Sequence, residues 1–332
     1  MAINLHGRNV LALDDFTPEE LHFLLDLARD LKAAKRAGSE RPRLVGKNIA
    51  LIFEKDSTRT RSGFEVAAHD QGAHVTYMGP SGSHIGQSET VKDTARVLGR
   101  MFDAIEFRGF AQSDVETLGK YAGVPVYNGL TEASHPTQIL ADFMTMREHT
   151  HKDLADIHFA FMGDGHNNMA RSLAMGAAKM GMTFCVGAPL AQRPDAAFVE
   201  QVNRIAKSTG AMITFEVDAN TAVKNADFIY TDVWLSMGED PVRWGQRIDL
   251  LKPYQVNASL MAQTGKSTTK FMHCLPSFHN TETVMGADIQ QRFGISAMEV
   301  TDDVFESKAS IVFDQAENRM HSIKAILLAT LG

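Results

Sequence analysis

A run of hydroxyl and guanidinium side chains follows the first strongly apolar segment of this chain. The sequence Ser57-Thr-Arg-Thr-Arg61 comes directly after the apolar run 49–53, and an apolar helical face begins at Phe64. Ser57 and Thr58 are residue types that cap helices, and the first turn of a helix presents unbonded N–H groups to an anion. The pattern indicates a bound anion such as phosphate. A capped helix start with solvated arginines is the alternative.

Two further polar clusters lie in the first half of the chain. Arg108 ends the apolar run 104–107, where it could hold a developing oxyanion or merely end an edge strand. His135 and Gln138 stand at an expected helix start, with Pro136 in its first turn. His135 could polarise a carbonyl oxygen while Gln138 holds the adjacent amide nitrogen. An ordinary helix cap is the alternative.

The second half carries polar groups after further apolar runs. Asn167 and Asn168 follow a Gly-Asp-Gly-His segment that lacks the third glycine of a dinucleotide-binding loop. One asparagine can cap a helix while the other holds the carboxylate of an amino acid. Asp232 ends an apolar run and suits a protonated amine, with a turn-forming role as the alternative. Trp234 and Leu235 are expected to fold over a ligand as a lid.

Cys274 ends the last apolar run, between His273 and Leu275-Pro276. Its thiol could contact a substrate amine or share the amine's proton, or it could be a small buried hydrophobe. The chain lacks the Cys-His-Asn order of a thiol protease, so we expect no covalent thiol mechanism.

The elements that must position these groups alternate between strands and helices. Strands are expected at 49–53, 74–78, 104–108, 124–127, 157–162, 183–186, 212–217, 228–232 and 271–274. Helices are expected at 88–102, 135–149, 167–181, 195–209 and 312–331, with a short one at 114–122. Such alternation predicts an α/β fold of two doubly wound domains with parallel sheets. We expect domains at 1–149 and 150–316, linked by helices, with a C-terminal helix, 317–332, returning to the first domain.

Size and composition narrow the class of protein. The chain has 332 residues, a net charge of -7 and 44% hydrophobic residues, which is ordinary for a soluble globular protein and argues against a nucleic-acid partner. No apolar run approaches the roughly 18 residues that span a bilayer, so no membrane partner is expected. Two cysteines make no disulfide framework, which favours the cytoplasm. No metal site is expected, because the histidines show no zinc-binding spacing.

Taken together, the motifs resemble those of the aspartate/ornithine carbamoyltransferases over essentially the whole chain. The stretches Ser57-Thr-Arg-Thr-Arg61 and His135-Pro-Thr-Gln138 are similar to both branches of that family. The stretches Asp232-Val-Trp-Leu-Ser-Met-Gly238 and His273-Cys-Leu-Pro276 are similar to the ornithine branch alone.

The resemblance implies which residues contact each substrate. The carbamoyl-phosphate contacts fall on Ser57, Thr58, Arg59, Thr60, His84, Arg108, His135, Pro136, Thr137, Gln138, Cys274, Leu275 and Arg319. The ornithine contacts fall on Asn168, Asp232, Ser236 and Met237. The catalytic residues among them would be Arg59, Arg108, His135, Asp232 and Cys274, with Asp232 and Cys274 as alternatives for handling the amine's proton.

The resemblance also implies a homotrimer, or a dodecamer built of trimers, with active sites near the contact between chains. A neighbouring chain would contribute His84, where relatives carry Gln or His. Two other positions depart from the family. Arg171 replaces a smaller polar residue one helical turn from Asn168, and Asp56 replaces a Thr or Pro before the phosphate loop.

The activity that the resemblance implies is carbamoyl transfer to the δ-amine of L-ornithine, giving L-citrulline and phosphate, without a cofactor. The direction stays open between arginine biosynthesis and the arginine deiminase pathway. Two alternatives remain: a carbamoyltransferase for another amine such as putrescine, and a catalytically silent binding paralogue. The second is disfavoured because Arg59, Arg108 and Arg319 are all present.

Overall fold

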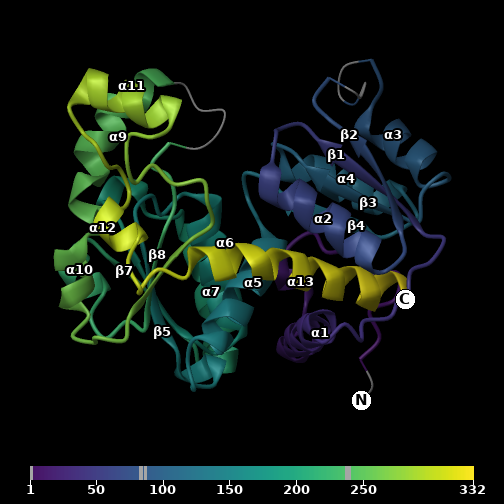
Figure 1. The fold of residues 1–332 in the computed structure, drawn as a ribbon, viewed down its shortest axis with the longest axis horizontal. Helices are drawn as coiled ribbons and strands as arrows, with labels where there is room; N and C mark the ends of the chain where they lie inside the picture. Colours follow the sequence, from purple (N-terminus) through teal and green to yellow (C-terminus); the bar gives the residue numbers. More distant parts are fainter. Residues whose placement is uncertain (1–2, 82–84, 86–87, 236–240) are drawn as a thin grey trace. The chain divides into compact units, whose positions relative to one another are not determined.

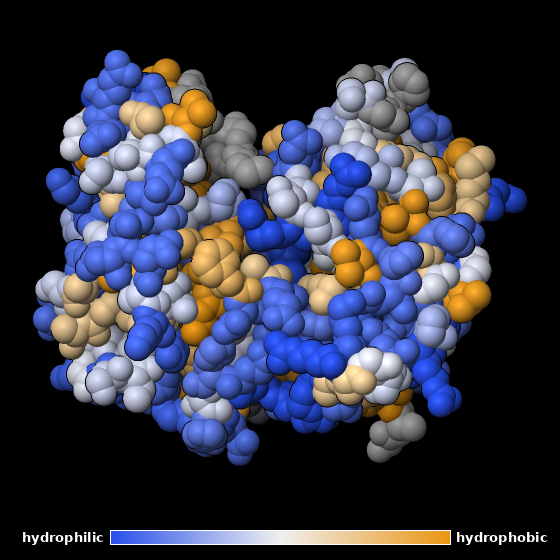
Figure 2. Space-filling model, viewed as in Figure 1, coloured by the Kyte–Doolittle hydropathy of each residue, from blue (hydrophilic) through white to orange (hydrophobic). Residues whose placement is uncertain are grey.

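The computed structural model describes every residue except 1–2, 82–84, 86–87 and 236–240. The chain divides into two compact units, Met1–Glu148 with Ala316–Gly332, and His149–Gln315. Figure 1 shows a parallel sheet with flanking helices in each unit. Figure 2 shows polar and charged groups over most of the visible surface, with apolar side chains in small scattered patches.

The first unit holds a four-stranded parallel sheet in the order β2-β1-β3-β4. Its strands are β1 (Asn48–Phe53), β2 (His74–Met78), β3 (Ala104–Arg108) and β4 (Val126–Leu130). Its helices are α1 (Pro18–Arg36), α2 (Thr58–Asp70), α3 (Val91–Leu98), α4 (Gln112–Tyr121) and α5 (Pro136–Glu148), with the greater part of α13 (Val312–Leu331). One apolar cluster joins β1 and β3 to α3 and α4, so these two helices cover one face of the sheet. Alternate residues of β3 therefore face α2 and α13 on the other side.

The second unit holds a five-stranded parallel sheet in the order β7-β6-β5-β8-β9. Its strands are β5 (His158–Met162), β6 (Thr183–Gly187), β7 (Met212–Glu216), β8 (Phe228–Thr231) and β9 (Lys270–His273). Its helices are α6 (Asn168–Lys179), α7 (Ala196–Thr209), α8 (Ala219–Ala222), α9 (Trp244–Leu251), α10 (Ala258–Gln263), α11 (Val284–Phe293) and α12 (Asp302–Phe305).

The predicted fold class is confirmed, including the return of the C-terminal helix to the first unit. On α13, Lys324 Nζ donates to Asp70 Oδ2 of α2 at 2.7 Å, and Asn318 Oδ1 accepts from Lys32 of α1 at 2.7 Å. Gly63 of α2 leaves room for α13, because a Cβ added there would lie 2.9 Å from Ile323 Cδ1. Polar and apolar contacts therefore both hold α13 against the helices of this unit.

Some predicted elements differ from the structure. The strand expected at 124–127 runs instead from Val126 to Leu130, because Pro125 cannot donate to the ladder and the pairing with β3 continues to Leu130. The helix expected at 88–102 is only Val91–Leu98, since the Thr90 side chain caps it by accepting from Asp93 N. Helices α8 to α12 were not predicted, because they are short and lack a long apolar repeat.

Strand order reverses once in each sheet, and this determines where ligands can bind. The reversal lies between β1 and β3 in the first unit and between β5 and β8 in the second. Ligands of doubly wound sheets bind outside the carboxyl ends of the strands at such a reversal. Those ends carry Ser57–Arg61 and Arg108 in the first unit, and Asn167, Asn168 and Asp232 in the second. Among the described residues, no helix combines the length and apolar character that crossing a membrane requires.

Candidate active site

The first half-site begins at the N-terminus of α2. Ser57 caps the helix, since its Oγ accepts from Thr60 N at 3.2 Å. Arg61 does not join this site: its Nε donates to Glu65 Oε1 at 2.9 Å and its guanidinium lies 3.8 Å from the Tyr77 ring centre. Arg61 was not among the predicted carbamoyl-phosphate contacts, and a residue four positions along the same helix face pairs with it.

Arg319 of α13 connects three segments of the first half-site. It is 3% exposed, and its Nη1 donates to Gln138 Oε1 at 2.5 Å and lies 3.2 Å from His135 Nε2. Its Nη2 donates to Thr60 Oγ1 at 3.1 Å and to Thr137 Oγ1 at 3.2 Å. The start of α2, the start of α5 and α13 thus meet at one buried guanidinium, although these residues lie far apart in the sequence.

Arg108 reaches the same point from the end of β3. It is 8% exposed, and its Nη1 donates to Thr60 Oγ1 at 3.3 Å. Thr60 therefore accepts from two arginines, and its buried hydroxyl sets their relative positions. The structure thus brings together Thr60, Arg108, His135, Thr137, Gln138 and Arg319 from the predicted carbamoyl-phosphate contacts.

His135 is neutral in this environment. Burial lowers its pKa well below the ordinary value, and the positive charges of Arg319, Arg108 and Arg59 lower it further. Nε2 lies 3.2 Å from an Arg319 N–H and therefore accepts, which leaves the proton on Nδ1, 3.5 Å from Thr137 Oγ1. Any hydrogen bond that this neutral ring donates must therefore come from Nδ1–H.

We expect His135 to reduce the stability of the protein as the pH falls below about 6.5. The unfolded imidazole takes up a proton there, whereas the folded one, with its lowered pKa, does not; acid therefore favours the unfolded chain. At pH 5.5 this contribution is about 1 kcal/mol. Thermal unfolding midpoints at pH 7.5 and 5.5 measure it. The shift should be smaller in His135→Gln than in the wild type, and unchanged in the exposed-site control His6→Gln. Equal shifts in all three proteins would contradict this expectation.

Gln138 uses both ends of its amide within the protein. Its Nε2 donates to Asp142 Oδ1 at 2.8 Å, and its Oε1 accepts from Arg319. These bonds fix the orientation of the amide, so Oε1 faces the arginine. Because an amide oxygen has two lone pairs, Oε1 can accept one further N–H group. Nε2, in contrast, is directed toward Asp142.

The second half-site is built around Asp232, directly after β8. Asp232 Oδ2 accepts from Asn167 Nδ2 at 3.0 Å, and Oδ1 accepts from Val233 N at 2.8 Å and from the Cys274 thiol at 3.1 Å. Asn167 also caps α6, since its Oδ1 accepts from Met169 N at 2.6 Å. Sequence reasoning left the roles of Asn167 and Asn168 open. The structure shows that one side chain, Asn167, both caps the helix and orients Asp232.

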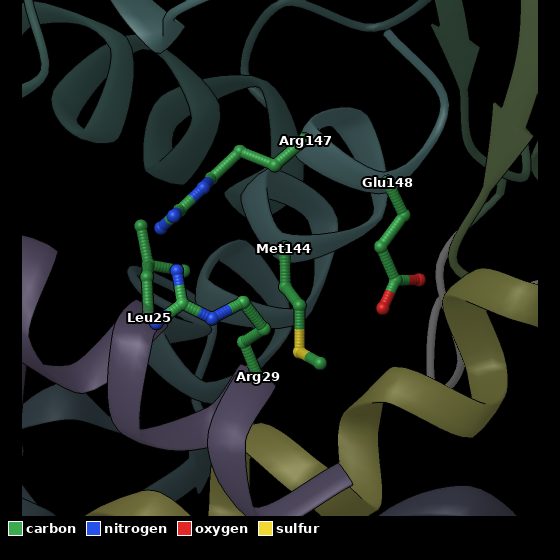
Figure 3. A pocket seen from close by; sticks show the side chains of 5 residues that line it. All are labelled: Leu25, Arg29, Met144, Arg147 and Glu148. Carbon is green, nitrogen blue, oxygen red and sulfur yellow. The ribbon is translucent and has the colours of Figure 1, made fainter. Parts of the chain in front are cut away.

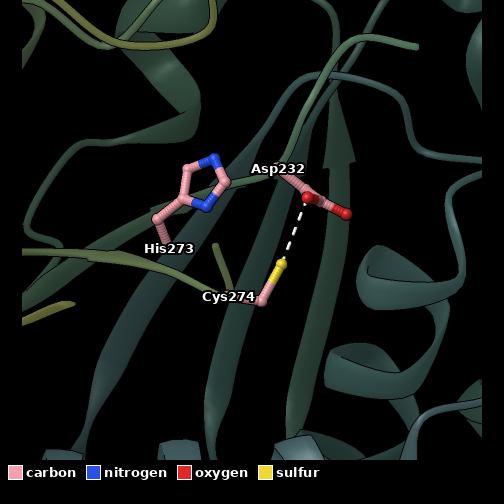
Figure 4. Close-up of side chains that lie close together, drawn as sticks. All are labelled: Asp232, His273 and Cys274. Atoms are coloured by element: carbon pink, nitrogen blue, oxygen red, sulfur yellow. Dashed lines mark hydrogen bonds between the residues drawn. The ribbon is translucent and has the colours of Figure 1, made fainter. Parts of the chain in front are cut away.

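The loop after β9 presents Cys274 to Asp232. Figure 4 shows the thiol directed at the carboxylate, with the His273 ring beside the pair. His273 Nδ1 accepts from Leu275 N at 2.8 Å, and its Nε2 lies 3.3 Å from Glu299 Oε1. Burial opposes ionisation of Glu299, but His273 and the Phe278 N–H lower its pKa below the ordinary value. Leu275 has a φ of 59°, a strained conformation that this bonded loop maintains.

Three groups that could bind a metal lie close together here. One oxygen of Asp232, one nitrogen of His273 and the sulfur of Cys274 all lie within 4.8 Å of one another. However, both nitrogens of His273 face other groups, Leu275 N and Glu299. The imidazole is thus oriented by the protein rather than offered to an ion, and the prediction of no metal site stays a prediction.

Trp234 and Leu235 do not have the expected role of a lid. They are 1% and 6% exposed and pack with Trp244, Ile248 and Leu251 of α9. Their size and apolar character draw them into the core of the second unit, where they anchor the segment that follows Asp232. The predicted ornithine contacts Ser236 and Met237, and the predicted neighbour contact His84, lie outside the described residues.

Two positions that depart from the resemblance, Arg171 and Asp56, take no part in the hydrogen bonds of the two half-sites described above. Arg171 Nη1 donates to Asp195 Oδ2 at 3.0 Å and the guanidinium lies 4.1 Å from the Phe198 ring centre, so it braces the start of α7. Asp56 is exposed. Nothing in the structure explains Asp56.

A small surface pocket of the first unit lies between α1 and α5 and is separate from the half-site. Figure 3 shows its lining side chains, Leu25, Arg29, Met144, Arg147 and Glu148. Its cations are already paired, because Arg147 Nη2 donates to Asp26 Oδ1 at 2.8 Å and Arg29 pairs with Asp26 and Asp30. The pocket therefore offers no free charge for an anionic ligand.

Comparison with known proteins identifies the family. Residues 8–148 match the family model described as "Aspartate/ornithine carbamoyltransferase, carbamoyl-P binding domain", and residues 155–330 match the companion Asp/Orn binding domain. The ornithine carbamoyltransferase structure from Pyrococcus furiosus is 40% identical, covers 100% of this chain and 99% of its own, and has a TM-score of 0.91. That from Gloeobacter violaceus is 38% identical, with coverage of 99% and 100% and a TM-score of 0.83. The anabolic ornithine carbamoyltransferase from Campylobacter jejuni is 30% identical, with coverage of 97% and 98% and a TM-score of 0.86.

These similarities extend over both units and include the stretches that carry both half-sites. The predicted relationship is confirmed. The chain belongs to the aspartate/ornithine carbamoyltransferase family and is a carbamoyltransferase.

Proposed function

We propose that this carbamoyltransferase acts on L-ornithine, transferring the carbamoyl group of carbamoyl phosphate to the δ-amine to give L-citrulline and phosphate. The observation that carries the proposal is the Asp232 carboxylate at the strand-order reversal of the second unit. Asn167 orients it, and its Oδ2 retains a lone pair for an ammonium group. The identity of 30–40% to ornithine carbamoyltransferases along whole chains supports the same acceptor.

In the proposed donor half, the phosphate lies at the N-terminus of α2 on Ser57, Thr58, Arg59 and Thr60. The capped helix start supports this placement, because its N–H groups and the Arg59 charge favour a dianion. Arg108 and neutral His135 would face the carbonyl oxygen, where negative charge grows as the tetrahedral intermediate forms. Preorganised donors of this kind contribute about 3–4 kcal/mol each to transition-state stabilisation.

The other residues of the donor half would orient the carbamoyl group. Gln138 Oε1 accepts one N–H from Arg319 and has a second lone pair for the carbamoyl amide. Pro136 and Thr137 form the first turn of α5 that positions it. The resemblance also assigns Cys274 and Leu275 to the proposed carbamoyl-phosphate contacts.

In the proposed acceptor half, Asn168, Asp232, Ser236 and Met237 hold the α-carboxylate and α-ammonium groups of ornithine. The δ-ammonium group must lose one proton before its lone pair attacks the carbonyl carbon. The C–O bond to phosphate then breaks, and the phosphate leaves with the second proton of the attacking nitrogen. The Cys274 thiol keeps its own proton and donates it in a hydrogen bond to Asp232, so of the two groups the carboxylate is the one with oxygen lone pairs to accept a proton. We therefore assign acceptance of the amine's proton to Asp232, with the Cys274 thiol as its hydrogen-bonded partner.

Acceptor specificity is tested by supplying carbamoyl phosphate with ornithine, putrescine or aspartate and measuring each carbamoylated product. Putrescine is ornithine without its carboxylate, so a site with charged and amide groups for both α-substituents should discriminate against it. We expect kcat/KM for ornithine to exceed that for putrescine at least about 100-fold, which corresponds to about 3 kcal/mol. A preference for putrescine would replace the proposed acceptor, and turnover with none of the three amines would favour a silent paralogue.

We also propose a cytoplasmic homotrimer in which a neighbouring chain contributes His84 to each site. Whether the enzyme serves arginine biosynthesis or the arginine deiminase pathway is decided by steady-state kinetics in both directions together with a light-scattering mass. A hyperbolic carbamoyl-phosphate curve and a mass of three chains would favour biosynthesis. Sigmoidal saturation and a mass of twelve chains would favour the catabolic role.

A further inference from the structure

Glu106 is a fully buried carboxyl group that the proposed mechanism does not use. It lies in β3, an interior strand of the first sheet, and is 0% exposed. Among the residues that the structure describes, neither of its carboxyl oxygens has a hydrogen-bond partner. Burying a carboxylate without partners is costly, because the lost hydration is not replaced. Its retention in the sheet therefore calls for a compensating positive charge or a bound proton.

The surrounding backbone places this carboxyl beneath the first half-site, which contains Thr60, Arg108 and Arg319 and is called the anion half-site below. Glu106 and Arg108 are two residues apart in β3 and so share the face that carries α2 and α13. A Cβ added to Gly129 of β4 would lie 1.8 Å from Glu106 Oε1 and 3.1 Å from Thr60 Cγ2. The carboxyl thus fills the space left by a glycine, next to the threonine whose Oγ1 accepts from Arg108 and Arg319.

The charged and titratable groups around Glu106 come from several elements of the first unit. Arg108 lies on the same strand, β3, and Tyr127 of β4 is the register partner of Glu106. The anion half-site above adds Arg59 of α2, His135 before α5 and Arg319 of α13. Burial raises the pKa of Glu106 well above its usual range, and the positive charges of Arg108 and Arg319 oppose that rise. A phosphate group bound to these arginines would cancel their effect and favour the protonated acid.

We propose that Glu106 is the proton-linked counter-charge of the anion half-site: its ionised form balances the arginines, and binding of a phosphate dianion makes it take up one proton from solvent. Glu106 is in this sense a positioning residue, acting on the substrate through Arg108, Arg319 and Thr60. Its carboxylate becomes a carboxylic acid and no other bond changes. The inference rests on the proposed function only in naming carbamoyl phosphate as the natural dianion.

Calorimetric titration with inorganic phosphate tests the inference, using wild type and Glu106→Gln at pH 6.5, 7.5 and 8.5. Each titration is run in two buffers of different ionisation enthalpy, so that proton uptake is counted directly. Because the titration of phosphate itself is the same for both proteins, the difference in proton uptake between wild type and variant isolates the contribution of Glu106. The amide imitates the neutral acid, so the two affinities should converge at low pH. In the pH range where wild type takes up more protons than the variant, the affinity of wild type for phosphate should fall as the pH rises. Relative to the affinity of Glu106→Gln, the fall should be up to tenfold per pH unit.

A matched control and a spectroscopic readout complete the test. Glu65→Gln, on the exposed side of α2, should behave as wild type. Infrared difference spectra should show a protonated-carboxyl band on phosphate binding in wild type and not in Glu106→Gln. If Glu106→Gln does not fold, Glu106→Met serves as the neutral variant. Equal proton uptake and parallel affinities in both proteins would overturn the inference, even if the enzyme makes citrulline. Glu106-dependent proton uptake without citrulline formation would uphold it and refute the proposed acceptor.

Discussion

Replacing Arg319 with methionine is expected to lower kcat/KM for carbamoyl phosphate by about 10²–10³-fold. Methionine nearly preserves the buried volume but removes a charged group that donates to Thr60, Thr137 and Gln138 and contacts His135. The loss of a preorganised charged donor costs about 3–4 kcal/mol in the transition state. The buried acceptors left unpaired add a loss of stability of about 1–3 kcal/mol each.

The measurement is steady-state kinetics at saturating ornithine, together with a calorimetric affinity for carbamoyl phosphate. Arg319→Lys should recover only a small part of the activity, because one ammonium group cannot reproduce the forked contacts of a guanidinium. Arg36→Met is the matched control, since Arg36 pairs at the surface with Glu317, two residues before Arg319 on α13. A loss of less than tenfold in Arg319→Met, with the fold intact, would remove Arg319 from the donor half.

Replacing Asp232 with asparagine is expected to lower kcat/KM for ornithine by about 10²–10³-fold while leaving the affinity for carbamoyl phosphate within about twofold. The carboxylate accepts from Asn167, Val233 N and the Cys274 thiol, and an amide with one oxygen cannot accept from all three. Loss of the charge that faces an ammonium group costs about 2–5 kcal/mol.

Intrinsic fluorescence provides a direct binding readout for this variant. The chain has only two tryptophans, Trp234 and Trp244, and both lie in one apolar cluster of the second unit. Trp234 is two residues after Asp232 in the sequence. Titration with norvaline, an ornithine analogue without the δ-amine, should change this fluorescence in wild type and much less in Asp232→Asn. Asp195→Asn, which alters a helix cap of the same unit, is the control and should bind as wild type. An unchanged KM for ornithine in Asp232→Asn would refute the assignment of Asp232 to the acceptor half.

Much of this protein is determined by its local sequence. An apolar run of strand length followed by a helix-capping residue is enough to place β1, the Ser57 cap and the start of α2, because strand burial and capping depend on neighbouring residues. The same reasoning located Arg108, Asp232 and Cys274 at strand ends, and parallel strands direct those ends to one edge of a sheet. The fold class followed from the alternation of elements.

Other features were decided only by the tertiary structure, since they depend on residues brought together from distant segments. Arg319 joins α2 and α5 because α13 packs against them, and no local pattern predicts its partners. Arg61 is directed to Glu65 and Tyr77 by its angular position on α2. Asn167 orients Asp232 across the boundary between β5 and β8. Glu106 appears in the sequence as one polar residue in an apolar strand, and only Gly129 of β4, whose missing side chain leaves room for the carboxyl, and the two arginines nearby reveal why a carboxyl group can lie there.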